Sequence, residues 1–184
     1  MENKDLNDKY YNIVKADFRS CRPGLNELER VYTQNNLREM LTLLVKFFVE
    51  TVDLRRVKIN EIAEEVPELI EEMKIYYNYN GDFKISESPE MQEFCFFQDN
   101  PEAEINFKIL GNALCKINIV DCKVTIKANS SSRIDCYSGG TSEISVELNQ
   151  FASMLMVNVD NSNPVEVVNN GTGSYHYKEI KINT

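Results

Sequence analysis

The sequence predicts an α+β protein with a helical N-terminal part and a C-terminal β-solenoid. Two observations support this fold class. Apolar residues recur at helical spacing in the first half of the chain. From residue 103 onwards, apolar and polar residues alternate in segments of about ten residues, each opened by a small residue. We therefore expect a helical domain at residues 1–92 and a β-solenoid repeat domain with capping segments at residues 93–184.

The first helix is predicted at residues 5–20, because its apolar residues recur every three or four positions. These residues are Leu6, Tyr10, Ile13, Val14 and Phe18. Residues 21–24 contain a proline and a glycine and are expected to form a turn. A second, short helix is predicted at residues 25–32.

The third helix is predicted to begin after Asn35 or Asn36, either of which can cap the first turn, and to end near Asp53. Its apolar stripe is wide, which is typical of a helix that is buried on most sides. The stripe contains Leu37, Leu41, Leu44, Phe48 and Val52.

A fourth helix is predicted from its cap Asn60, with a kink or a new start at Pro67 and helical periodicity through residues 68–77. Residues 78–82 have the composition of a turn. Residues 88–94 are predicted to form a further short helix, since a serine and a proline open the segment.

The C-terminal half divides into eight segments with the same internal order. The small residues that open them are Ala103, Ala113, Cys122, Ser132, Ser142, Ser153, Asn163 and Gly173. The first inward residues are Ile105, Cys115, Val124, Ile134, Ile144, Leu155, Val165 and Tyr175. The second inward residues are Phe107, Ile117, Ile126, Cys136, Val146, Val157, Val167 and Tyr177. Turn residues that tolerate a left-handed backbone are Asn129, Gly139, Asn149, Asp160 and Asn170.

Two architectures are compatible with strands at this spacing. In a β-solenoid the segments stack in parallel walls about 4.8 Å apart, whereas in an antiparallel β meander or sandwich neighbouring strands pair through hairpins. The recurrent corner chemistry favours the solenoid, with two or three walls. Only Asn170-Gly171 has the residue pair typical of a tight hairpin.

In a two-walled solenoid every second segment stacks, which predicts two outer columns. One column is Lys116, Asp135, Met156 and His176, and the other is Lys108, Lys127, Glu147 and Val168. We expect Lys116 and Asp135 to form a charge pair between coils. Residues 93–102, with Phe94, Phe96 and Phe97, are expected to plug one end of the interior, and residues 175–183 to cover the other.

The segments "NPEAEI" at residues 100–105 and "GNA" at residues 111–113 carry a resemblance to known proteins. The chain resembles a loose group of bacterial proteins with short β-solenoid repeats behind a helical N-terminal region, often from phage-derived or mobile elements. The resemblance covers roughly residues 93–170. The repeats here are degenerate and "GNA" occurs once. The resemblance implies the architecture and no particular activity.

The charge of the chain excludes some partners. The net charge is −9, and both halves contain more acidic than basic residues. We therefore expect no nucleic-acid partner and no binding to anionic membranes. The N-terminus has no signal-peptide pattern, and the five cysteines contain no CxxC pair. We expect reduced thiols and a cytoplasmic protein.

Few residues are candidates for chemistry, and we predict no catalytic, cofactor-binding or metal-binding residues. His176 is the single histidine and is expected to lie on an outer β surface. Four cysteines (Cys95, Cys115, Cys122 and Cys136) are too widely spaced for a zinc site and are expected to be buried thiols. The outward carboxylates Asp135, Glu147 and Glu166 are the candidates for carbohydrate chemistry.

These observations lead to three hypotheses about function. The first is a non-enzymatic structural or interaction protein, derived from a phage or mobile element, whose solenoid is a rigid spacer or assembly surface. It requires a protein partner or a homo-oligomer. The second is a carbohydrate-binding or carbohydrate-active β-helix protein. The third is an acidic immunity or antagonist protein, which the interspersed lysines of the repeat disfavour.

Overall fold

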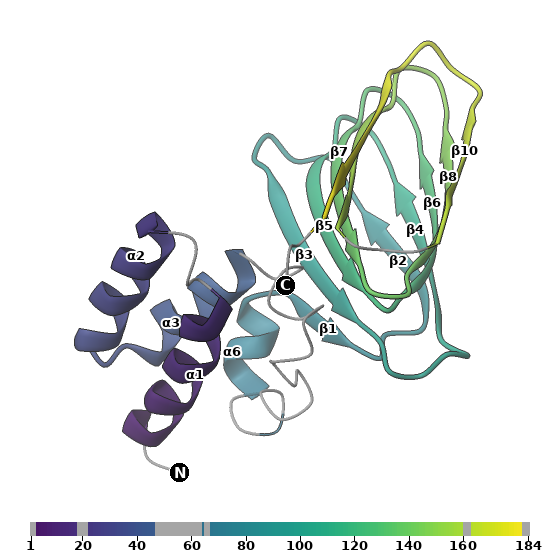
Figure 1. The fold of residues 1–184 in the computed structure, drawn as a ribbon. Helices are drawn as coiled ribbons and strands as arrows, with labels where there is room; N and C mark the ends of the chain where they lie inside the picture. The colour runs from purple at the N-terminus through teal and green to yellow at the C-terminus, as the bar shows by residue number, and fades with distance from the viewer. Residues whose placement is uncertain (1–2, 18–21, 47–63, 65–66, 160–162, 182–184) are drawn as a thin grey trace.

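Helices come first in the chain and a stack of parallel strands follows (Figure 1). The computed structural model describes residues 3–17, 22–46, 64, 67–159 and 163–181. The described helices are α1 (Asn3–Asp17), α2 (Arg22–Thr33), α3 (Leu37–Lys46) and α6 (Pro67–Glu72). The predicted order, a helical part followed by a β-solenoid, is confirmed.

The described strands form two sheets in which every pair of neighbours is parallel. Sheet A contains β1 (Ile75–Tyr77), β3 (Gln92–Phe97), β5 (Leu114–Val120), β7 (Arg133–Gly139), β9 (Ser153–Val159) and β11 (Tyr175–Ile180). Sheet B contains β2 (Gly81–Ile85), β4 (Glu104–Ile109), β6 (Lys123–Ala128), β8 (Glu143–Leu148) and β10 (Val165–Asn169). Successive strands alternate between the sheets, so the chain winds as a two-walled solenoid. The antiparallel alternative is wrong.

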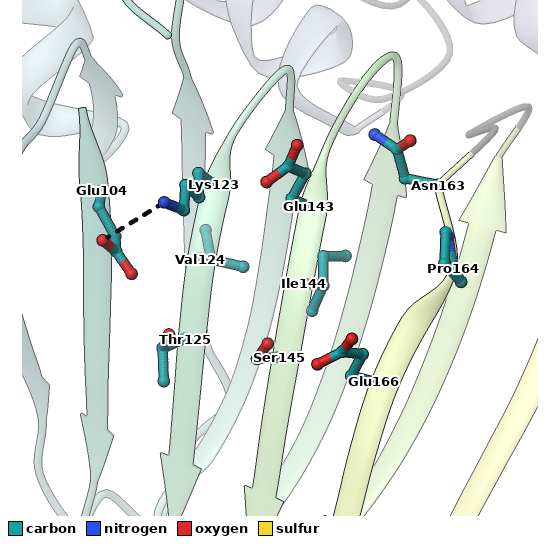
Figure 2. Close-up of a pocket in the computed structure, with 10 residues that line it drawn as sticks. All are labelled: Glu104, Lys123, Val124, Thr125, Glu143, Ile144, Ser145, Asn163, Pro164 and Glu166. Atoms are coloured by element: carbon teal, nitrogen blue, oxygen red, sulfur yellow. Dashed lines mark ion pairs between the residues drawn. The ribbon is translucent and has the colours of Figure 1, made fainter. Parts of the chain in front are cut away.

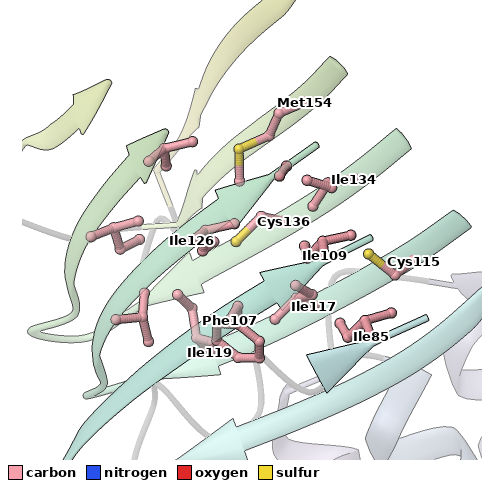
Figure 3. Close-up of a cluster of buried hydrophobic side chains, with 14 of the residues drawn as sticks. Ile85, Phe107, Ile109, Cys115, Ile117, Ile119, Ile126, Ile134, Cys136 and Met154 are labelled. Atoms are coloured by element: carbon pink, nitrogen blue, oxygen red, sulfur yellow. The ribbon is translucent and has the colours of Figure 1, made fainter. Parts of the chain in front are cut away.

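The space between the two sheets holds the main hydrophobic core. Alternate side chains of each strand point inward, and those of Phe107, Ile117 and Ile126 are fully buried. Figure 3 shows isoleucines, two cysteines, Phe107 and Met154 meeting between the sheets. Full burial of such a side chain contributes about 1.5–3 kcal/mol, which makes this core the main source of stability.

The corners of the stack repeat a left-handed backbone conformation. The residues are Gly111 (φ 69°), Asp121 (φ 55°), Ser130 (φ 61°), Gly140 (φ 67°) and Gln150 (φ 57°). The prediction for Asn129 and Asn149 is wrong by one residue, because both asparagines still donate their N–H groups to carbonyls of the neighbouring coil. The chain turns only after these last ladder bonds. The predicted corner at Asp160 lies outside the described residues.

The register of sheet B agrees with the predicted outer column. Lys108 pairs with Lys127, Lys127 with Glu147, and Glu147 with Val168. All the inward residues predicted for β4 to β8 are also buried. The alternation of the sequence is therefore sufficient to assign the faces of these strands.

Strand β9 is the exception, because its predicted inward residues Leu155 and Val157 point outward. Met154 and Met156 point inward instead and are buried. The corner before β9 has the same length as the corners before β5 and β7, so Ala152 rather than Ser153 takes the small buried position. The outer column of sheet A is therefore Glu93, Lys116, Asp135, Leu155 and His176.

Aromatic side chains close the N-terminal end of the solenoid. Tyr76 stacks on Phe96 with ring centroids 4.8 Å apart, and Tyr79 meets Phe83 edge to face at 5.4 Å. Phe94 and Phe96 point inward as expected, whereas Phe97 points outward and stacks on Tyr77. These aromatic rings thus cover the apolar interior at the first coil of the solenoid.

The sheets begin earlier than the predicted boundary at residue 93. Residues 75–77 form β1 and residues 81–85 form β2, where the sequence suggested the end of the helical domain. The helix predicted at 88–94 is wrong, since Gln92–Phe97 is a strand paired with β5. Pairing with the neighbouring coil outweighs the local helix signal of this segment.

Two features of the helices differ from the prediction and one agrees with it. Pro23 and Gly24 lie in the first turn of α2 rather than in a turn before it. Helix α6 ends at Glu72, and Lys74 takes a left-handed conformation (φ 54°) before β1 begins. Asn36 caps α3 as predicted, accepting a hydrogen bond from the Glu39 N–H at 3.2 Å. The helix predicted after Asn60 and the end of the third helix near Asp53 lie mostly outside the described residues.

The helices gather beside the solenoid, with α6 next to β1 (Figure 1). Their apolar cluster includes Tyr10, Leu28 and Met40 and extends to outward residues of sheet A such as Val120 and Val157. This packing explains why Val157 is buried although it faces away from the solenoid interior. None of the described helices has the length and apolar character needed to cross a membrane.

Candidate functional site

The last coil of the solenoid leaves one edge of each sheet without a partner strand among the described residues. Strand β10 pairs only with β8, and β11 pairs only with β9. Parallel strands direct the N–H and C=O groups of alternate residues to opposite sides. Asn170 donates its N–H to the Leu148 carbonyl at 2.8 Å, so Val167 and Asn169 direct theirs to the open side.

The interior is partly exposed at this end. Val165 and Val167 are only half-buried, and Tyr177 is 50% exposed. The residues in register with them one coil earlier, Ile144 and Met156, are 3% and 0% exposed. The segment predicted to cover this end, residues 175–183, instead contributes β11 as the last strand of sheet A. We call the surface formed by β10 and β11 the open end.

The open end was not predicted from the sequence, for an identifiable reason. The repeat pattern continues into the last two strands, although the last is the least regular, so it marks them as ordinary coils. One signal could have revealed it, because the inward positions of the last segment hold Tyr175 and Tyr177, whose hydroxyl groups suit a partly exposed site.

Close approach of the backbone also shapes the last coil. The N–H groups of Thr172 and Gly173 both contact the Gln150 carbonyl, at 2.7 and 3.2 Å. A Cβ atom on Gly171 or Gly173 would collide with the backbone of the preceding coil. Glycine is therefore required where the connection between β10 and β11 crosses that backbone.

A shallow depression of about 330 Å³ lies on the outer face of sheet B (Figure 2). Thr125, Ser145 and Glu166 form a row across β6, β8 and β10. Lys123 and Glu104 form an ion pair at 3.8 Å beside Glu143. The depression thus offers hydroxyl and carboxylate groups on a flat β surface, and the described residues that line it include no aromatic side chain.

The structure separates one of the three carboxylates that the sequence suggested for carbohydrate chemistry from the other two. Glu147 and Glu166 together line one hollow on the outer face of sheet B, whereas Asp135 lies on sheet A. Glu147 also forms an ion pair with Lys127 at 3.2 Å, which lowers its pKa. A low pKa suits an ionised group and not a general acid. Glu143, which was not among the residues predicted from the sequence, joins Glu166 in the depression.

On the outer face of sheet A, Lys116 pairs with Glu93 at 2.6 Å rather than with Asp135. Lys116 and Asp135 are neighbours in the ladder, as predicted, but Asp135 forms its ion pair with Arg133, at 3.9 Å. His176 is exposed on β11, and Leu155 separates it from Asp135 in the same column. The two groups are therefore not positioned as an acid–histidine pair.

The four described cysteines are free and buried, as predicted. Cys115 and Cys136 point into the core, Cys122 occupies a small position, and Cys95 lies under Asn118. Burial raises the pKa of Cys95 and of Cys115 to about 12, and it raises the pKa of Cys122 and Cys136 as well. Among the described residues, no group of three or more His, Cys, Asp or Glu side chains is arranged to hold a metal ion.

The thiols are expected to be unreactive in the folded protein. In a Cys21→Ser variant at pH 8, the four remaining thiols should react with a thiol reagent only after unfolding, because the reactive thiolate is scarce when the pKa is raised. The measurement is the labelling rate with and without denaturant. Rapid labelling of the native variant would contradict this burial.

Comparison with known protein families, with curated proteins and with solved structures finds no match to this chain. The resemblance to bacterial short-repeat solenoid proteins therefore stays a prediction.

Proposed function

We propose that this protein is a non-enzymatic assembly protein, in which the solenoid is a rigid spacer and its open end is a protein-binding surface. The open end supports this proposal most directly, because unpaired strand edges and half-exposed apolar side chains are typical of interaction sites. The helical part would position the solenoid from the outer face of sheet A, where its apolar cluster contacts residues such as Val120 and Val157. We place the protein in the cytoplasm, since its described cysteines are free thiols.

The character of the outer faces supports the same proposal. The charged residues of sheet B are largely matched with each other, through pairs such as Lys108 with Asp82 and Lys127 with Glu147. Such exposed pairs keep a flat β surface soluble. The described interior between the sheets is filled with apolar side chains such as Phe107, Ile117 and Ile126.

Site-specific photo-crosslinking in cells tests the proposal. A photoreactive phenylalanine analogue replaces Tyr177 at the open end or, as a control, Met91, which is 48% exposed near the first coil. We expect a crosslinked protein adduct from position 177 and not from position 91. Absence of any protein adduct from position 177 would contradict the proposed function.

Carbohydrate binding is a second candidate function, favoured by the row of Thr125, Ser145 and Glu166 in the depression of sheet B. These groups can donate and accept hydrogen bonds to sugar hydroxyls. A glycan array probed with the whole protein tests this candidate. Binding that a Glu166→Ala, Ser145→Ala double variant abolishes would support it, and an array without signal would remove it.

A further inference from the structure

We infer that the occupant of the open end is a second copy of this chain, so that two solenoids join end to end as a closed dimer, an inference that rests on the proposed function. The open end consists of two strand edges separated by the width of the core. A matching surface must present two strand edges at the same separation, and the end of another solenoid does so. This requirement selects a copy of the chain over an unrelated partner with a single strand.

The N-terminal end of a neighbouring copy is a poor match for the open end. There the interior is closed by the Tyr76, Tyr79 and Phe83 cluster, and α6 leads directly into the three-residue strand β1. Joining the two kinds of end would also produce an open filament rather than a closed assembly. When two open ends pair with each other, the assembly is complete with two copies, and the exposed interior of each copy is covered.

Two rotations can bring the open ends together with antiparallel strands across the junction. One places β11 against the partner's β11 and β10 against the partner's β10. The other, about an axis parallel to the strands, places β11 against the partner's β10 on both walls. Strands β10 and β11 run in opposite directions on opposite walls, so both rotations give antiparallel pairs (Figure 1).

The charges on the outer faces select the second rotation. Glu166 is the outward charge of β10, and Lys178 is an outward charge of β11. Both side chains are exposed, and neither forms an ion pair with another described residue. Placing β11 against β11 sets like charges on the same junction, which is unfavourable, whereas β11 against β10 brings opposite charges together.

One register of this pairing matches both faces at once. With Tyr177 opposite the partner's Val167, Lys178 lies opposite the partner's Glu166. The inward residues then cover each other's half-exposed apolar surfaces, and the outward residues form a charge pair on each wall. The inward Glu179 is already paired with Lys181 at 3.7 Å, which offsets its charge. Val167 and Asn169 supply the free backbone groups for the new ladder.

Sedimentation equilibrium of the purified full chain tests the inference. We expect a dimer of twice 21.3 kDa that dissociates on dilution. The Lys178→Glu and Glu166→Lys variants should each raise the dissociation constant at least about tenfold, since two pairs per dimer become repulsive. Lys84→Glu, an exposed charge change on the first coil, is the matched control and should leave the constant unchanged.

A mixture of the two charge variants gives the decisive result. In an equal mixture of Lys178→Glu and Glu166→Lys chains, every junction of the heterodimer again has opposite charges, so the dimer should return. A mixture that stays monomeric would overturn the β11-to-β10 pairing. A wild-type chain that is monomeric at all concentrations, or that grows beyond dimers, would overturn the closed dimer. In that case a crosslinked adduct between Tyr177 and a different protein would still support the proposed function.

Discussion

Replacing Phe107 by alanine is expected to lower the free energy of unfolding by about 3–5 kcal/mol. The Phe107 ring is fully buried between the sheets and lies 5.0 Å from the Phe96 centroid and 5.7 Å from that of Phe83. Its removal leaves a cavity that neighbouring coils cannot fill, because both walls are held in place by their strand ladders. Urea denaturation followed by circular dichroism measures the change.

The matched control for Phe107 is Phe151, which is 68% exposed at the corner between β8 and β9. A Phe151→Ala variant removes the same atoms from a site in contact with water, so we expect a change within about 0.5 kcal/mol. Equal losses in the two variants would contradict the two-walled core, because they would indicate that Phe107 is no better packed than a surface ring.

Replacing Met156 by aspartate is expected to destabilise the protein by more than about 4 kcal/mol, enough to prevent folding in a chain of ordinary stability. Met156 is fully buried and pairs in register with Cys136. An aspartate there would place an unpaired carboxylate among apolar side chains. Thermal unfolding of the purified variant, or its failure to appear in the soluble fraction, measures the effect.

Two further variants make the Met156 prediction specific to the register of β9. Met156→Leu keeps the volume and should cost less than about 1.5 kcal/mol. Leu155→Asp should cost less than Met156→Asp, because Leu155 points outward and is only partly buried against the helical cluster. If Leu155→Asp were the more damaging variant, β9 would have the register that the segment boundaries in the sequence suggest.

The solenoid could be predicted from the sequence because the alternation within each strand defines its two faces independently. Val124 and Ile126, for example, are separated by one polar residue, and the same alternation recurs in β4, β7 and β8. Because the corners between strands are short, equivalent residues of successive coils lie next to each other, and no long-range signal in the sequence is needed to align them. The error in β9 arises where the pattern is ambiguous, since "SMLMVNV" has apolar residues on both faces. The outward ones are needed because they contact the helical cluster.

The edges of the fold were less predictable for a different physical reason. Residues 75–77 and 92–97 become strands because neighbouring coils supply ladder partners far away in the sequence. The periodicity of a short segment contains no information about strand partners that lie far away in the sequence. The candidate site has the same limitation, since the open end is recognised only from the described strands β10 and β11, each of which pairs on one side. The burial of Cys115, Cys122 and Cys136, in contrast, could be predicted directly from their places in the repeat.

The alternation of strands between two walls constrains how the length of this chain can change. One full coil takes about twenty residues, as the pairing of Val124 with Ile144 shows. Deleting a full coil would shorten the rod and leave each later strand on its own wall. Deleting a single strand would transfer all later strands to the opposite wall. The two strands of the terminal surface would then exchange walls. Insertions and deletions that preserve the terminal surface should therefore comprise whole coils.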